Sequence, residues 1–308
     1  MIDPATLMGP LWTLLVFVAL GWLAARRLAV DPRPIATLLI YLIAPLTFFR
    51  GLILGGPTPD YLLLTTALFA TASLLALLVN RLARGLLPSM ESALLAFSAG
   101  TGNTGYFGLP VAMVLLPPEG VTLYLFCILG VTLYEFTVGF YLSARGQFSV
   151  RDSLVKILRL PLIYAFLAAL LVSGLGVDMP APVMEGLEAF PATYTLLGMM
   201  IIGMTLGRVS LREFDARFIA ACVAVRFILW PLLSLAVAVG LQPLLSADMA
   251  MVILLLGVVP MAANVVVVAM ELGIRPEKGA LAVLITTLAA PLLIPLYLTG
   301  MAHLAGLG

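Results

Sequence analysis

Ten long apolar segments limit how this chain can fold more than any other feature of the sequence. A helix needs about 20 mainly apolar residues to cross the roughly 30 Å hydrocarbon core of a bilayer. Of the 308 residues, 63% are hydrophobic and 10% are charged, which excludes a soluble enzyme because a soluble surface needs more charge. We therefore expect an all-helical membrane protein with ten transmembrane helices and no separate soluble domain. The segments lie near residues 7–25, 35–54, 61–79, 90–116, 121–143, 160–177, 191–207, 218–240, 249–270 and 280–302.

Basic residues alternate from loop to loop along the chain. Cytoplasmic loops of membrane proteins carry an excess of Lys and Arg. Fourteen of the sixteen basic residues fall in the loops after spans 1, 3, 5, 7 and 9, whereas the even-numbered loops carry acidic residues only. This alternation predicts ten spans with both termini outside the cytoplasm. The fourteen residues are Arg26, Arg27, Arg33, Arg81, Arg84, Arg145, Arg151, Lys156, Arg159, Arg208, Arg212, Arg217, Arg275 and Lys278.

The ten spans divide into two halves of five, residues 1–150 and residues 151–308. Because five is an odd number, the second half enters the membrane from the opposite side, which is the topology of an inverted repeat. The fourth span of each half is interrupted, first by GTGNTGYFGLP at 100–110 and then by GVVPMAAN at 257–264. Interrupted segments at equivalent places in two halves indicate the binding site of a transporter.

The two breaks carry residue types that suit a binding site at membrane depth. Unwound backbone persists there only where it is buried in protein or lines a wet cavity. We expect the glycines of the first break to permit non-helical backbone angles and Pro110 to end the preceding helix. Asn103 and Asn264 each offer one acceptor and two donors without a full charge, and half-helix N-termini suit an anion. The alternative is that the glycines serve only close helix packing and the prolines only make kinks. The predicted substrate-binding residues at the breaks are Asn103, Gly105, Gly108, Pro110, Pro260 and Asn264.

Three ionisable residues lie inside predicted spans, where the cost of a charge makes a functional role the first hypothesis. Glu135 and Arg226 lie at the same predicted depth, about 12 Å from the cytoplasmic ends of spans 5 and 8. We hypothesise that they pair, with Arg226 either neutralising Glu135 or binding a substrate carboxylate, and with Glu135 as the candidate for ion coupling. The alternative is a purely structural ion pair. Arg50 lies about 6 Å from the outer end of span 2, where snorkelling to the interface explains it as well as substrate contact does.

At the two breaks the sequence resembles the auxin efflux carrier family in its bacterial form. The resemblance rests on NTGYFGLP at 103–110, on PMAAN at 260–264, and on Arg226 with Pro231 in span 8. It implies a secondary transporter of the bacterial inner membrane, with periplasmic termini, in which spans 4 and 9 cross at their breaks. Spans 1, 2, 6 and 7 would form a scaffold that often dimerises, and spans 3–5 and 8–10 a transport core that moves like an elevator.

The resemblance also implies a class of substrate. Family substrates are carboxylated organic anions such as auxins and, among bacterial members, malonate, so a mono- or dicarboxylate is expected. Related bile acid symporters bind sodium whereas plant auxin carriers do not need it, which leaves coupling to H⁺ or Na⁺ open. No cofactor is expected. A nucleic-acid partner is not expected either, because the net charge of +1 provides no basic field. A channel or membrane sensor is the alternative, and an intramembrane enzyme is disfavoured because HExxH and GxSxG motifs are absent.

Overall fold

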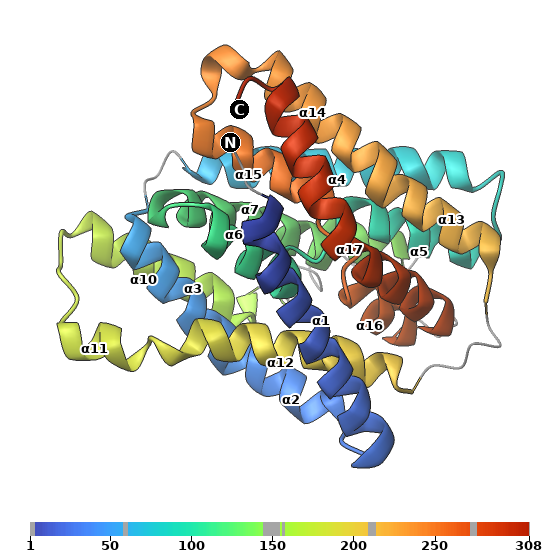
Figure 1. Ribbon diagram of the computed structural model, residues 1–308, viewed down its shortest axis with the longest axis horizontal. Coiled ribbons are helices and arrows are strands. Elements are labelled where there is room, and N and C mark those ends of the chain that lie inside the picture. The colour runs from blue at the N-terminus through green and yellow to red at the C-terminus, as the bar shows by residue number, and fades with distance from the viewer. Residues whose placement is uncertain are drawn as a thin grey trace.

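The computed structural model describes residues 4–57, 61–143, 155, 158–208, 214–271 and 276–307 (Figure 1). Within these ranges the chain is helical and contains no strand. Among the described residues, seven helical stretches are long and apolar enough to cross a membrane. The expected all-helical, multi-pass architecture is therefore confirmed, while the count of ten spans remains a prediction. The seven stretches are Leu7–Arg27, Pro32–Gly55, Tyr61–Ala83, Pro118–Ser143, Ala181–Leu206, Ala216–Gly240 and Lys278–Leu304.

Every apolar segment of the sequence contains helix, and the two segments expected to be interrupted are divided into shorter pieces. The first half contains α1 (Pro4–Arg27), α2 (Pro32–Leu38), η1 (Leu39–Ile43), α3 (Ala44–Gly55), α4 (Tyr61–Ala83), α5 (Ser89–Gly100), η2 (Thr104–Gly108), α6 (Leu109–Leu115), α7 (Pro118–Tyr134), η3 (Glu135–Gly139) and α8 (Phe140–Ser143). The second half contains α10 (Pro161–Gly174), α11 (Ala181–Gly186), α12 (Ala189–Leu206), α13 (Ala216–Ala224), η5 (Val225–Leu229), α14 (Trp230–Gly240), η6 (Gln242–Leu244), α15 (Ala247–Val258), α16 (Asn264–Glu271) and α17 (Pro276–Leu304).

Three prolines account for three of the π-helical turns. Pro45, Pro110 and Pro231 each follow the end of a π-helical turn by two residues, after η1, η2 and η5 respectively. Proline has no N–H to donate and its ring crowds the preceding turn, so the helix widens locally. The fourth turn, η3, begins at Glu135 without a nearby proline. Such turns occur often at functional sites, which draws attention to Glu135.

The expectation that Pro110 ends the preceding helix is wrong. Helix α5 already ends at Gly100, because Thr101 is extended with φ −130° and ψ 147°. Pro110 is the second residue of α6, which continues directly from η2, so it lies within the helix that follows the break.

The helices pack in two groups, each of which combines elements from both halves of the chain. In the first group α1 packs along α12, and α10 packs against α3 (Figure 1). In the second group α4 packs against α5 and α7, while α15 packs against α14 and α17. The groups meet where α3 contacts α7 and where α1 contacts α17. The first group is therefore α1–α3 with η1, α10 and α12, and the second is α4–α8 with α13–α17.

Loops that carry basic residues meet one another. Arg208 Nη1 lies 3.5 Å from Asp31 Oδ1, which joins the loops after spans 7 and 1. Lys278 contacts both Glu91 and Asp215, which brings together the ends of spans 10, 4 and 8. These contacts are those expected if the odd-numbered loops lie on one side of the membrane. The basic residues Arg145, Arg151, Lys156, Arg212 and Arg275 lie outside the described residues.

Candidate functional site

The two interrupted helices touch at their unwound segments. The first segment, residues 101–103, separates α5 from η2, and the second, residues 259–263, separates α15 from α16. The backbone N–H of Asn103 donates a hydrogen bond of 2.7 Å to the Pro260 carbonyl oxygen. A backbone group freed from one helix is thus satisfied by a carbonyl freed from the other, which is how unwound chain avoids unpaired polar groups at membrane depth.

A cavity of about 240 Å³ lies at this contact and is lined by both groups of helices. Both unwound segments contribute to it, with residues of η3 from the second group and residues of η1, α3 and α12 from the first. Most of the lining is apolar or aromatic, as is usual for a small-molecule site. Its polar and aromatic lining residues include Asn103, Thr104, Thr132, Glu135, Asn264, Tyr106, Tyr194, Phe48 and Phe97.

The carboxyl group of Glu135 connects the first unwound segment to the start of α16, which directly follows the second segment. The Thr101 hydroxyl donates to Glu135 Oε1, and Asn264 Nδ2 donates to Oε2 at 2.8 Å. Glu135 is 7% exposed, so it is a buried carboxyl whose cost is offset by two hydrogen-bond donors. Thr101 was not among the predicted site residues, although it belongs to the glycine-rich run that marked the first break.

Asn103 has a side-chain amide that is only half used. Its Oδ1 accepts a hydrogen bond of 3.2 Å from Phe107 N and so caps the N-terminus of η2. Its Nδ2 is buried and has no hydrogen-bond partner among the described residues. A buried donor without a partner is costly, and a ligand oxygen in the cavity that Asn103 lines would satisfy it.

Arg226 does not pair with Glu135, so that hypothesis is wrong. The guanidinium is 2% exposed; its Nε donates to the Val259 carbonyl, and its Nη2 donates to the Leu256 carbonyl at 2.5 Å. These are carbonyls at the end of α15, where a cation both pairs the free acceptors and opposes the negative end of the helix dipole. The guanidinium also lies 5.1 Å from the centre of the Trp230 ring and does not line the cavity.

Helix α5 ends in the same way, but against neutral donors. Trp230 Nε1 donates to the Ala99 carbonyl at 2.7 Å, and the Tyr134 hydroxyl lies 3.1 Å from the Phe97 carbonyl, to which it donates. In the second unwound segment Met261 N donates to Thr286 Oγ1 at 3.2 Å. The sequence analysis did not predict the roles of Trp230, Tyr134 and Thr286. Each has a single polar group on a largely apolar side chain, so none stands out in an apolar span.

The glycines of the first break allow close packing of neighbouring side chains. None of Gly100, Gly102, Gly105 and Gly108 has a positive φ, so none adopts the left-handed backbone angles that favour glycine. A Cβ at Gly102 would meet the Arg226 guanidinium, and a Cβ at Gly105 would meet the Tyr194 hydroxyl. The packing interpretation, which was the alternative, therefore describes these positions better.

Only some of the predicted site residues line the cavity. Gly105 and Asn264 line it together with Asn103 and Glu135, whereas Gly108, Pro110, Pro260 and Arg50 do not. Pro260 contributes its carbonyl to the contact between the segments. Arg50, in α3, is partly buried, and its Nε has no hydrogen-bond partner among the described residues. Their roles in binding remain predictions.

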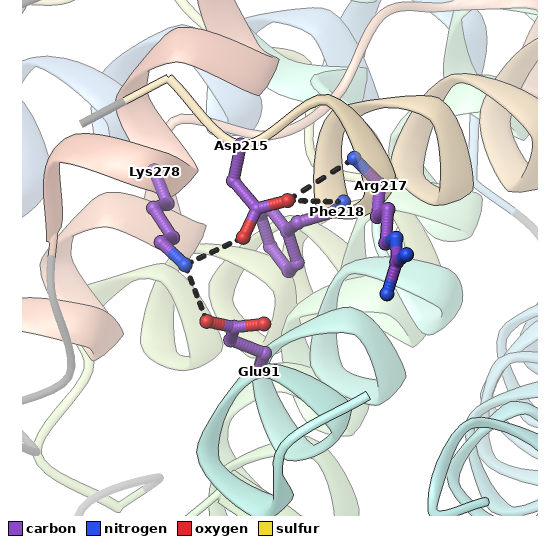
Figure 2. Close-up of polar contacts among 5 residues, drawn as sticks. All are labelled: Glu91, Asp215, Arg217, Phe218 and Lys278. Atoms are coloured by element: carbon purple, nitrogen blue, oxygen red, sulfur yellow. Dashed lines mark hydrogen bonds and ion pairs between the residues drawn. The ribbon is translucent and has the colours of Figure 1, made fainter. Parts of the chain in front are cut away.

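A second polar cluster lies away from the cavity, at the ends of α5, α13 and α17 (Figure 2). Lys278 Nζ donates to Glu91 and, at 2.6 Å, to Asp215 Oδ2. The other Asp215 oxygen accepts from Arg217 N and Phe218 N, both at 3.1 Å, and so caps the N-terminus of α13. The hydrogen bond from Lys278, followed by that from Phe218 N, holds the pKa of the Asp215 carboxyl below its usual range. This cluster links one helix of the first half to two helices of the second.

No family model and no curated protein matches this chain. The resemblance to auxin efflux carriers therefore rests on the motif residues themselves. Of these, Asn103, Gly105 and Asn264 line the cavity, and Pro260 joins the two segments.

Proposed function

We propose that this protein is a secondary transporter, similar to auxin efflux carriers, that moves a small organic anion across the inner membrane by alternating access. The observation that carries the proposal is the hydrogen bond from Asn103 N to Pro260 O, beside a cavity that Asn103, Glu135 and Asn264 line. Transporters bind substrate where two interrupted helices meet at a mainly apolar cavity that contains a few polar groups.

The anion would be held by uncharged donors. Asn103, whose buried Nδ2 has no partner among the described residues, lines the cavity, and Asn264 supplies a second amide. The N-terminal turn of α16 lies beside Asn264 and adds the positive end of a helix dipole. A mono- or dicarboxylate fits these donors better than a cationic or apolar solute does, because carboxylate oxygens accept several hydrogen bonds at once.

The position of the cavity supports an elevator motion. Phe48 and Tyr194 line it from the first group of helices, whereas both unwound segments line it from the second. A substrate at that boundary would travel with the second group as it slides along the first. We propose that these groups are the scaffold and the transport core, within ten spans arranged as an inverted repeat with periplasmic termini, and that the scaffold forms a homodimer.

A thermal-shift screen of the purified protein against mono- and dicarboxylates tests the class of substrate. A ligand that binds the folded state at 100 times its Kd stabilises it by about 2.7 kcal/mol, which is readily measured. The proposal expects organic anions to raise the transition temperature. A shift with neutral or cationic solutes alone would contradict the anion assignment.

Counterflow in proteoliposomes tests the transport mechanism. Liposomes loaded with an unlabelled anion that stabilised the protein should take up the labelled anion transiently, with saturable rates. Thr101→Val, which removes a partner of Glu135, should slow this exchange, whereas Thr66→Val removes a hydroxyl from the exposed face of α4 and should leave it unchanged. Flux that does not saturate and shows no counterflow would indicate a channel, and conversion of the solute would indicate an enzyme.

A further inference from the structure

We propose that the anion binds together with one proton, and that Glu135 is the residue that carries it. The inference rests on the proposed function, because it concerns the same cavity and the same substrate. It names the coupling ion of that transport and the side chain that couples it.

The cavity contains a carboxyl group and, among its described lining residues, no basic side chain. Glu135 is the one acidic or basic side chain among the described residues of the lining. Both of its oxygens accept from neutral donors, Thr101 and Asn264. Arg226, the buried cation that the sequence predicted as a partner of Glu135, instead donates to the carbonyls at the end of α15. An organic anion that enters this cavity therefore meets a carboxyl group without a cation between them.

The groups around Glu135 do not supply that cation. The titratable side chains that face it are Tyr106 on η2, Tyr134 on α7 and Tyr194 on α12, all of them neutral in their ordinary state. Helices α4, α5 and α8 also pack against η3. Their titratable residues make no hydrogen bond or ion pair with the Glu135 carboxyl; these are Tyr61, Arg81, Glu91 and Tyr141.

Two like charges in one small buried cavity repel strongly, because little water is present to screen them. A proton on Glu135 removes that repulsion, and the resulting O–H can donate to a carboxylate oxygen of the substrate. The proton comes from the solution on the side from which the anion enters, and both leave on the other side. No bond other than the Glu135 O–H bond forms or breaks.

Protonation also changes what Asn264 can do. The Asn264 amide now donates to Glu135 Oε2 at 2.8 Å, and a neutral acid accepts that bond more weakly than a carboxylate. The amide then becomes available to the anion. Uptake of a proton would thus release Asn264, the first residue after the second unwound segment, from Glu135 at the moment when the substrate needs a donor.

Calorimetric titration counts the protons directly. Binding of malonate and of indole-3-acetate, as a dicarboxylate and an aromatic monocarboxylate, is measured at one pH in HEPES and in Tris, whose ionisation enthalpies differ. The difference in apparent binding enthalpy should correspond to about one proton taken up per anion. Glu135→Gln should bind the anion with no proton uptake. Glu119→Gln, the same change on an exposed residue of α7, should behave as the unmodified protein does.

Transport against a pH gradient provides the second readout. A gradient of one pH unit, acidic on the entry side, should raise steady-state accumulation by about tenfold, the ratio of the two proton concentrations. Glu135→Gln should exchange anions in counterflow without this dependence, while Glu135→Asp, which keeps an acid, should retain it. Protein-free liposomes correct for passive entry of undissociated acid.

The outcomes separate this inference from the proposed function. Binding and counterflow without proton uptake, or proton uptake that survives in Glu135→Gln, would overturn the role of Glu135 and leave the transporter proposal intact. Binding that needs Na⁺ and takes up no proton would do the same. If neither probe nor any other organic anion binds or exchanges, both proposals fail.

Discussion

The side-chain amide of Asn264 donates a hydrogen bond of 2.8 Å to Glu135 Oε2, while the Thr101 hydroxyl donates to the other oxygen. One carboxyl group on η3 therefore accepts hydrogen bonds from the first unwound segment and from the first residue of α16, which directly follows the second segment. Because the same cavity is lined by Glu135, Asn103 and Asn264, a change in the charge or position of this carboxyl acts on both breaks and on the cavity together. The predictions below separate residues that would contact the ligand from residues that position the segments.

Asn103→Asp is expected to weaken anion binding by about tenfold or more, and also to lower stability, because it adds a second buried carboxyl to the cavity that Glu135 lines. Aspartate keeps the oxygen that caps η2 by accepting from Phe107 N, but it replaces the unpartnered Nδ2 donor with a negative charge. Asn103→Ala should instead cost about 1 kcal/mol of stability, because the cap is lost. Thermal unfolding with and without ligand measures both effects. Equal ligand-induced shifts in Asn103→Asp and the unmodified protein would remove Asn103 from the site.

Arg226→Met is expected to destabilise the protein by about 2–4 kcal/mol, since the carbonyls of Leu256 and Val259 lose charged donors in a buried place. Arg226→Lys should restore part of this stability because one ammonium can reach one of the two carbonyls. At a temperature where both variants are folded, the transport rate should fall while the affinity for the anion stays close to that of the unmodified protein. A large loss of affinity with normal stability would show that Arg226 binds substrate after all.

Hydropathy and charge predicted the helical, membrane-spanning architecture because a span depends on length and composition, which are local properties. The breaks near Asn103 and Asn264 were equally visible, since glycine, proline and asparagine interrupt apolar runs.

The predicted pairing of Glu135 with Arg226 was wrong for a different reason. Position along a span predicts depth, whereas the partner of a side chain depends on the face of the helix and on neighbouring helices. Arg226 lies beside the end of α15, and only the packing of η5 and α14 against α15 shows this.

Tyr124 and Thr101 illustrate what sequence reasoning could not reach. Tyr124 is fully buried in α7, and its hydroxyl has no partner among the described residues. In the sequence it is one aromatic residue in an apolar run, with no sign that it packs against Gly108. Thr101 stood inside the run that marked the break, so its place near the site was predictable, but its bond to Glu135 requires the two helices to be placed side by side.

Gly108→Ala is expected to destabilise the protein by about 1–3 kcal/mol, because the added methyl group would meet the Tyr124 hydroxyl and Val259 Cγ1. Tyr124→Phe alone should be neutral or slightly stabilising, since it removes a buried hydroxyl without a partner. The double variant should recover part of the loss, because the hydroxyl is gone while Val259 still has to move. Unfolding temperatures of the four proteins form a double-mutant cycle, and additive effects would contradict this packing.

The contact between Lys278 and Asp215 should make stability depend on pH (Figure 2). The folded-state pKa of Asp215 lies below its unfolded value, chiefly because Lys278 donates a hydrogen bond to it. The contribution of Asp215 to stability is therefore fully present above the unfolded pKa of about 3.9 and is lost as the pH falls through the lower folded pKa.

Asp215→Asn keeps a side-chain oxygen to cap α13 but removes the charge that faces Lys278. The variant should unfold at a lower temperature than the unmodified protein at pH 7, and the difference should shrink as the pH is lowered below 4. Asp178→Asn, at an exposed position, is the matched control and should show no such convergence. A difference between Asp215→Asn and the unmodified protein that stays constant from pH 7 to pH 3 would show that the charge of Asp215 contributes nothing to the cluster.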